Sequence, residues 1–93
     1  MALSTFSDFE SRLGSIFHIT VDSGLVPVIL KEAKSLGHGR REGGAFSLVF
    51  EGPADTDLPQ AVYRLQTDDE TLDVFLVPIG PFGDGMGFEA VFT

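Results

Sequence analysis

The chain has 93 residues, of which 43% are hydrophobic and 22% are charged, as in an ordinary globular domain. This length predicts one domain covering residues 1–93, with a single core. The absence of cysteine excludes disulfide bonds, thiolate metal sites and cysteine nucleophiles. The N-terminus lacks the pattern of a secretory signal and no run approaches 18 apolar residues, so we expect a cytoplasmic protein with no membrane span.

The charge of the chain is unevenly distributed. The net charge is −8, yet residues 31–42 carry a local +2, and the remainder of the chain therefore carries −10. An acidic body repels phosphate backbones and anionic membranes, so we expect neither nucleic acid nor a membrane as a partner. The basic stretch, with Lys34, Arg40 and Arg41, is interpreted as a solvated loop or as a patch that meets an acidic protein surface.

The first fourteen residues predict a short helix. Apolar residues recur at helical spacing on one side, namely Leu3, Phe6, Phe9 and Leu13. Ser7 with Glu10 fits a capping box, Thr5 or Ser4 is an alternative cap, and Gly14 is a natural stop. A helix this short does not persist alone in water, so we expect its apolar side to dock on a sheet.

Six strands are predicted after Gly14, because apolar residues then alternate with polar ones. The strand segments are 17–22, 25–36, 46–51, 61–67, 71–80 and 88–93. Pro27 lacks an amide hydrogen, so the second strand either lies at an edge there or begins after the proline. The fold class expected is mainly β: a single antiparallel six-stranded meander, or a partly closed small barrel, with a short N-terminal helix.

The segment GPFGDGMG at residues 80–87 holds four of the eleven glycines. A phosphate-binding loop needs a helix after it, whereas strand alternation follows here and Asp84 would repel a phosphate. Asp84-Gly85 is typical of a hairpin turn, so this segment is interpreted as a connection between two strands.

Other chemistry-bearing residues form no convergent set in the sequence. Neither His18 nor His38 has a partner at zinc-site spacing, and the acidic residues at 55–57 and 68–70 do not follow a calcium-loop pattern. No serine lies in a nucleophile elbow. We therefore expect a protein that is not an enzyme, with no catalytic residues, metal or cofactor. Tyr63, the only tyrosine, is expected to reach the backbone of the 53–59 connection with its hydroxyl.

The fifth predicted strand is apolar on both faces. Leu72, Val74 and Leu76 occupy one face, and Phe75, Val77 and Ile79 occupy the other, a pattern that Val49 and Val91 continue on other strands. A sheet that exposes one face to solvent should carry polar residues on that face. We therefore expect this apolar second face to be covered by the curled sheet itself, by the N-terminal helix, or by a partner.

Four segments carry a resemblance to a known family: AFSLVFEGPADTDLPQAVYRLQ, LDVFLVPIG, the terminal FEAVFT, and Phe9, Leu13, Gly14, Phe17 and Ile19. The chain resembles an uncharacterised family of small bacterial domains with FSLxFxGP, LPQxxYxL, LFLVPxG and YEAVF segments. Ala61-Val62 stands where the family often has Gly-Thr, and Phe88 replaces a tyrosine. The resemblance implies no activity; members encoded near phage-tail-collar-like proteins imply an assembly role.

Two functions are left open by the sequence. The first is a non-enzymatic protein-interaction or assembly module, accessory to a phage-tail-like assembly. It would bind a partner or itself through the basic loop, with Lys34, Arg40 and Arg41, or through the apolar second face, with Phe75 and Val77. The second is a small-ligand-binding β-barrel lined by phenylalanines. A six-stranded barrel fills its interior with side chains, which favours the first.

Overall fold

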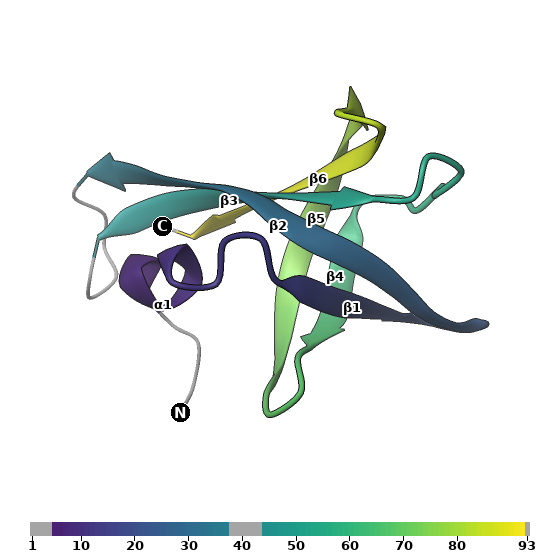
Figure 1. Ribbon diagram of the computed structural model, residues 1–93, viewed down its shortest axis with the longest axis horizontal. Helices are drawn as coiled ribbons and strands as arrows, with labels where there is room; N and C mark the ends of the chain where they lie inside the picture. Colours follow the sequence, from purple (N-terminus) through teal and green to yellow (C-terminus); the bar gives the residue numbers. More distant parts are fainter. Residues whose placement is uncertain (1–4, 38–43, 93) are drawn as a thin grey trace.

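The computed structural model describes residues 5–37 and 44–92. One short helix, α1 (Phe6–Glu10), precedes six strands (Figure 1). The strands are β1 (Ile16–Val21), β2 (Gly24–Gly37), β3 (Ala45–Gly52), β4 (Ala61–Gln66), β5 (Thr71–Phe82) and β6 (Gly85–Phe92). Every pair of neighbouring strands is antiparallel. The expected fold class is confirmed.

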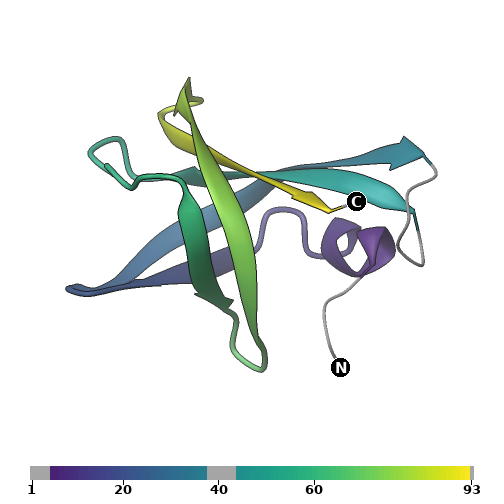
Figure 2. The ribbon, with the colours of Figure 1, turned by 180° about the vertical axis from the view of Figure 1, so that it is seen from behind.

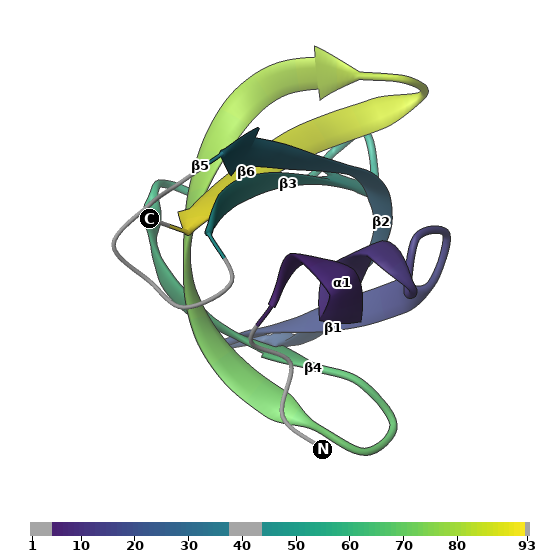
Figure 3. The same cartoon turned by 90° about the vertical axis from the view of Figure 1, so that its left-hand side faces the viewer.

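The six strands close into a ring in the order β1-β2-β3-β6-β5-β4. The order departs from a meander in two pairings, β3 with β6 and β1 with β4, because the chain crosses from β3 to β4 through residues 53–60. Figure 3 looks along the ring and shows α1 across its near end. The ring is closed between β1 and β4 by two residue pairs, His18 with Gln66 and Ile19 with Leu65.

Two long strands, β2 and β5, bend and change partners along their length. Residues 24–29 of β2 pair with β1, and residues 29–37 pair with β3. In the same way, residues 71–76 of β5 pair with β4 and residues 77–82 pair with β6. Each bend lies at a register shift, at Leu30/Glu32 in β2 and at Pro78/Gly80 in β5. Such bulges increase the local twist that closure of a small sheet requires.

Phenylalanines fill the interior of the ring. The rings of Phe17 and Phe50 meet edge to face at 5.3 Å between centroids. At the end covered by α1, Phe46 stacks on Phe92 at 4.6 Å, and Phe9 lies within 5.7 Å of both. Phe9 is fully buried although it belongs to a helix of five residues. Tertiary packing of this ring, rather than helix propensity, therefore stabilises α1.

The helix differs from its prediction in extent and position. Thr5 is the N-cap and forms a capping box with Asp8, so the alternative cap is confirmed and the Ser7–Glu10 box is wrong. The helix ends at Glu10, and Leu13, expected to face inward, is 45% exposed. Leu3 lies outside the described residues. The helix lies against the core at the end of the ring rather than across the outer face of the late strands (Figures 1 and 3).

The glycine-rich segment forms a hairpin, as expected, but a tighter one. The strands continue to Phe82 and resume at Gly85, so only Gly83 and Asp84 connect them. Gly83 has a φ of +59°. A β-carbon on Gly85 would overlap the carbonyl oxygen of Gly52, so glycine is required there by the close approach of two strands.

Substitution of Phe9 tests whether α1 belongs to the core. We expect Phe9→Ala to lower the free energy of unfolding by about 3 to 5 kcal/mol, the range for loss of a buried aromatic side chain. Leu13→Ala is the matched control, because Leu13 is exposed and its removal should cost less than about 0.5 kcal/mol. Urea denaturation followed by circular dichroism measures both, and equal midpoints for the two variants would contradict this account.

Candidate functional site

The outer face of β4 and β5 carries apolar side chains that are exposed or half-buried, which we call the outer patch: Val62, Phe75 and Val77. Val62 lies directly opposite Phe75 across β4 and β5, and Val77 follows on the same face of β5. Phe75 is 51% exposed and Val62 65% exposed. The expectation that Phe75 and Val77 turn away from the core is confirmed, because Val74 and Leu76 point inward and are buried. Among the described residues, neither the curled sheet nor α1 covers Phe75.

Two other residues of the apolar second face have different surroundings. Val49, on β3, is only 8% exposed; it lies between Glu32 of β2 and Glu89 of β6 in the sheet register. Ile79 is 44% exposed and lies over Gly87, where a β-carbon would be 2.8 Å from its side chain. The exposed residues of the second face therefore lie on β4 and β5, with Val91 near the end of β6.

Polar groups border the outer patch. Beside Val62 and Phe75, the Arg64 guanidinium contacts the Asp73 carboxylate at 3.3 Å. Glu89 lies opposite Val77. An apolar surface with charged residues at its rim is the usual composition of a protein-binding surface.

The basic stretch is only partly described. Lys34 lies in β2, is exposed, and is opposite Ser47, which in turn is opposite Val91. The sheet register therefore places Lys34, Ser47 and Val91 on one row of the outer face, and β3 and β6 separate Lys34 from the outer patch. Arg40 and Arg41 lie outside the described residues.

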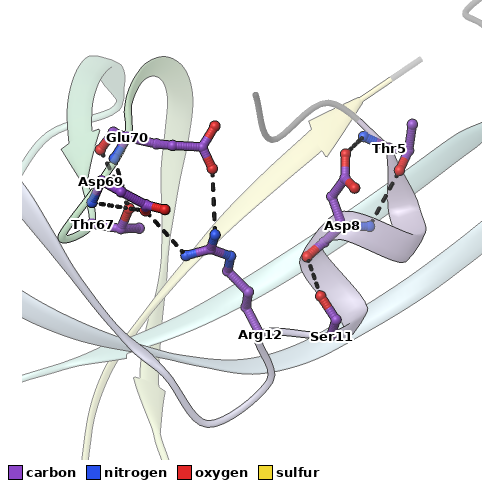
Figure 4. Close-up of polar contacts among 7 residues, drawn as sticks. All are labelled: Thr5, Asp8, Ser11, Arg12, Thr67, Asp69 and Glu70. Atoms are coloured by element: carbon purple, nitrogen blue, oxygen red, sulfur yellow. Dashed lines mark hydrogen bonds and ion pairs between the residues drawn. The ribbon is translucent and has the colours of Figure 1, made fainter. Parts of the chain in front are cut away.

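A second polar cluster joins the segment after α1 to the β4–β5 turn (Figure 4). Arg12 contacts the Glu70 carboxylate at 3.4 Å and the Asp69 carboxylate at 3.8 Å. Thr67 accepts hydrogen bonds from the N–H groups of Asp69 and Glu70, which fixes the turn. These contacts bridge the same two parts of the ring that the β1–β4 pairing joins, so Arg12 reinforces the closure.

A surface hollow brings together His18 and two of the acidic residues that the sequence analysis considered as metal ligands. His18, Arg12, Asp68 and Asp69 line a hollow of about 660 Å³ between β1 and the β4–β5 turn. In the described ranges no three His, Asp or Glu side chains are placed to hold a metal ion. His38 is not described. No helix in the described part is long and apolar enough to cross a membrane.

A smaller hollow, of about 310 Å³, lies on the outer face near the β5–β6 turn, with Ile16 and Ile29 as its apolar floor. Glu51 at its rim accepts a hydrogen bond from the Asp84 N–H at 3.0 Å and contacts Lys31 at 3.6 Å. Its carboxylate is thus engaged in holding the β5–β6 turn against β3.

The sequence prediction for Tyr63 is confirmed. Its hydroxyl donates a hydrogen bond of 2.6 Å to the Pro59 carbonyl, and its ring packs against the margin of the core. Desolvation raises the pKa of the Tyr63 phenol above its ordinary value. The role of this residue is to hold the 53–60 connection against β4.

Sequence reasoning did not identify Val62 or the Arg12 contacts. The signal for Val62 was present in AVYRLQ, where alternation places Val62 on the same face as Arg64. No sequence pattern indicated the Arg12 contacts, because Asp69 and Glu70 are 57 and 58 residues away in the sequence.

The chain belongs to the family described as the domain of unknown function DUF6916, whose model matches residues 4–92. This match supports the expected membership of an uncharacterised domain family. No curated protein and no solved structure matches the chain.

The titration of Tyr63 tests its partial burial and its hydrogen bond. Because this is the only tyrosine, phenolate absorbance reports it alone, and we expect a pKa above the ordinary value when folded and an ordinary value in urea. Because the pKa of Tyr63 is raised in the folded state, the contribution of this residue to the free energy of unfolding is complete below its pKa in the unfolded chain. That contribution is lost as the pH rises through its pKa in the folded protein. Tyr63→Phe should therefore lose less stability at alkaline pH than the wild type does. Equal pKa values for Tyr63 in the folded and unfolded states would contradict the assignment.

Proposed function

We propose that the domain is a non-enzymatic protein-interaction module that binds its partner through the outer patch. The observation that carries the proposal is the exposure of Phe75 next to Val62, on a face that neither α1 nor another strand of the described ranges covers. A large aromatic side chain that remains half exposed on a rigid strand gains apolar contact only when a second surface covers it. Aromatic residues in that position are frequent hot spots of protein interfaces.

The position of the patch on strands supports a preformed binding surface. Val62, Phe75 and Val77 belong to paired strands of the ring, so their backbone is already fixed before binding. Binding then costs little conformational entropy beyond the side chains of the partner. Lys34 lies on β2, with β3 and β6 between it and β5, so as an exposed charge outside the patch it would affect the rate of association more than the affinity.

A ligand-binding interior is supported less well. Phe17, Phe46, Phe50 and Phe88 point into the ring and are fully buried against one another and their neighbours. Their side chains take up the space that a ligand would need, as in other small closed sheets. The apolar surface available to a second molecule is on the outside.

The biological setting is proposed from the resemblance to small bacterial domains. A small interaction module encoded near phage-tail-collar-like proteins fits an accessory part of a phage-tail-like assembly, in which repeated protein contacts are the main requirement. The acidic body and the exposed patch are compatible with a role in which the domain is one subunit of a larger assembly.

The test compares two side chains of equal exposure. Phe75 and Leu25 are both 51% exposed, but Leu25 lies on β2 near the β1–β2 turn. Wild-type protein, Phe75→Ser and Leu25→Ser are immobilised separately, and proteins retained from a lysate of the source organism are quantified by mass spectrometry. We expect a partner that wild type and Leu25→Ser retain equally and that Phe75→Ser retains at least tenfold less. Equal retention by all three proteins, with unchanged urea midpoints, would contradict the proposal.

A further inference from the structure

The first half of β5 has one edge that no described strand covers. Residues 71–76 pair with β4 on one side, whereas pairing with β6 on the other side begins only at Val77, opposite Glu89. Figures 1 and 2 show why: the lower half of β5 runs away from the end of β6. The edge of residues 71–76 is called the open edge of β5 below.

The phase of the hydrogen bonds identifies the backbone groups on this edge. The Thr67 N–H donates to the Glu70 carbonyl at 2.8 Å, which makes this the first hydrogen-bonded pair of the β4–β5 ladder. Hydrogen-bonded and non-hydrogen-bonded pairs alternate along an antiparallel ladder. Leu72, Val74 and Leu76 therefore bond to β4. It follows that the backbone N–H and C=O groups of Thr71, Asp73 and Phe75 point to the open edge.

The other long open half-edges of β2 and β5 are protected. By the same alternation, Pro78 points its nitrogen to the side of β5 where β4 has ended, and Pro27 points its nitrogen to the side of β2 where β3 has not yet begun. Pro81 faces the same side as Pro78, because the extra residue at the Pro78/Gly80 register shift reverses the alternation. A proline there removes a donor that an added strand would use. The second half of β2 has α1 beside it. The start of β4 extends beyond its pairing with β1, but there only Val62 and Arg64 face the unpaired side.

We propose that the open edge of β5 binds an extended, basic segment of another protein, which adds to the sheet as a further strand. Three alternate residues of the edge offer both a donor and an acceptor, and this is the arrangement that strand addition uses. The inference rests on the proposed interaction function and specifies how the partner binds beside Phe75.

The side chains along the open edge define the chemistry of the partner. On the inner face, Leu72 is partly buried at the margin of the core, so the inward side chains of the added strand should be apolar. On the outer face, Asp73 and the ring of Phe75 are exposed. Lysine or arginine at the outward positions would meet the Asp73 carboxylate, which Arg64 contacts from the β4 side, and would pack on the Phe75 ring. The turn at residues 68–70 adds three acidic side chains at the start of the edge, of which Arg12 pairs with two.

A second copy of the chain fits the edge less well. Antiparallel pairing of two β5 edges about their middle would place Asp73 opposite its own equivalent, and like charges in that position are destabilising. Each copy also carries a net charge of −8. Charge complementarity therefore favours a basic strand over self-association.

The test uses proline to close the edge, as the protein does at Pro78 and Pro81. Asp73→Pro removes the N–H that faces the open edge, and the ladder with β4 does not use that N–H. Asp73→Ala is the matched control, because it removes the same carboxylate and keeps the N–H. Thr71→Pro closes the edge two residues earlier and serves as the second closing variant if Asp73→Pro is unstable. Urea denaturation checks that each variant is folded.

The probe is a fluorescein-labelled octapeptide of alternating valine and lysine, with a valine–glutamate octapeptide as its acidic counterpart. Fluorescence polarisation should show binding of the basic peptide to wild type and a Kd at least tenfold weaker for the closing variant than for Asp73→Ala. Amides of Thr71, Asp73 and Phe75 should gain protection from exchange when the peptide is bound.

The outcomes separate this inference from the proposed function. Equal binding by Asp73→Pro and Asp73→Ala, with loss only in Phe75→Ser, would overturn strand addition and leave the outer patch as a side-chain surface. Preference for the acidic peptide, or no binding of the basic one, would overturn the inference even if Phe75→Ser still loses the protein partner. Sedimentation that shows a wild-type dimer and a monomeric Asp73→Pro would assign the edge to a second copy and overturn the basic partner.

Discussion

The structure depends on two long strands, β2 and β5, that each pair with one neighbour along the first half and with a different neighbour along the second half. A flat six-stranded sheet of this size would leave one face of its phenylalanine core in water. Because β2 and β5 bend at register shifts and exchange partners halfway, the sheet turns back on itself and covers that core from both sides. The bulges at Leu30/Glu32 and Pro78/Gly80 are the local features that permit the turn.

The same bends create the edges that the protein must protect. A strand that leaves one neighbour before meeting the next exposes backbone donors and acceptors over several residues, and such edges invite unwanted pairing. At three of these positions a proline lacks the N–H that an added strand would use, and α1 lies beside the second half of β2. The first half of β5 has no such protection in the described ranges, and it carries the exposed ring of Phe75. An edge and an apolar patch therefore meet on one strand, which is why we place the interaction there.

Much of this fold was predictable, because period-two alternation identifies strands whatever their partners are. The edge position of Pro27 and the hydrogen bond of Tyr63 followed from elementary backbone and side-chain chemistry. The pairing of β3 with β6, the burial of Val49 and the exposure of Leu13 did not follow, since they depend on contacts between residues distant in sequence. For the candidate site, alternation was enough to find Phe75 and Val77. The open edge was beyond sequence reasoning, because it requires knowing where each pairing stops.

Amide hydrogen exchange of the free protein, followed residue by residue by NMR, tests the central claim most directly. The amides of Leu72, Val74 and Leu76 bond to β4 and should exchange slowly, whereas those of Thr71, Asp73 and Phe75 should exchange near the rate of exposed amides. This alternation of fast and slow exchange along residues 71–76 is the result that the account predicts. Uniform protection of all six amides would show that another part of the molecule covers the edge, and would contradict the account.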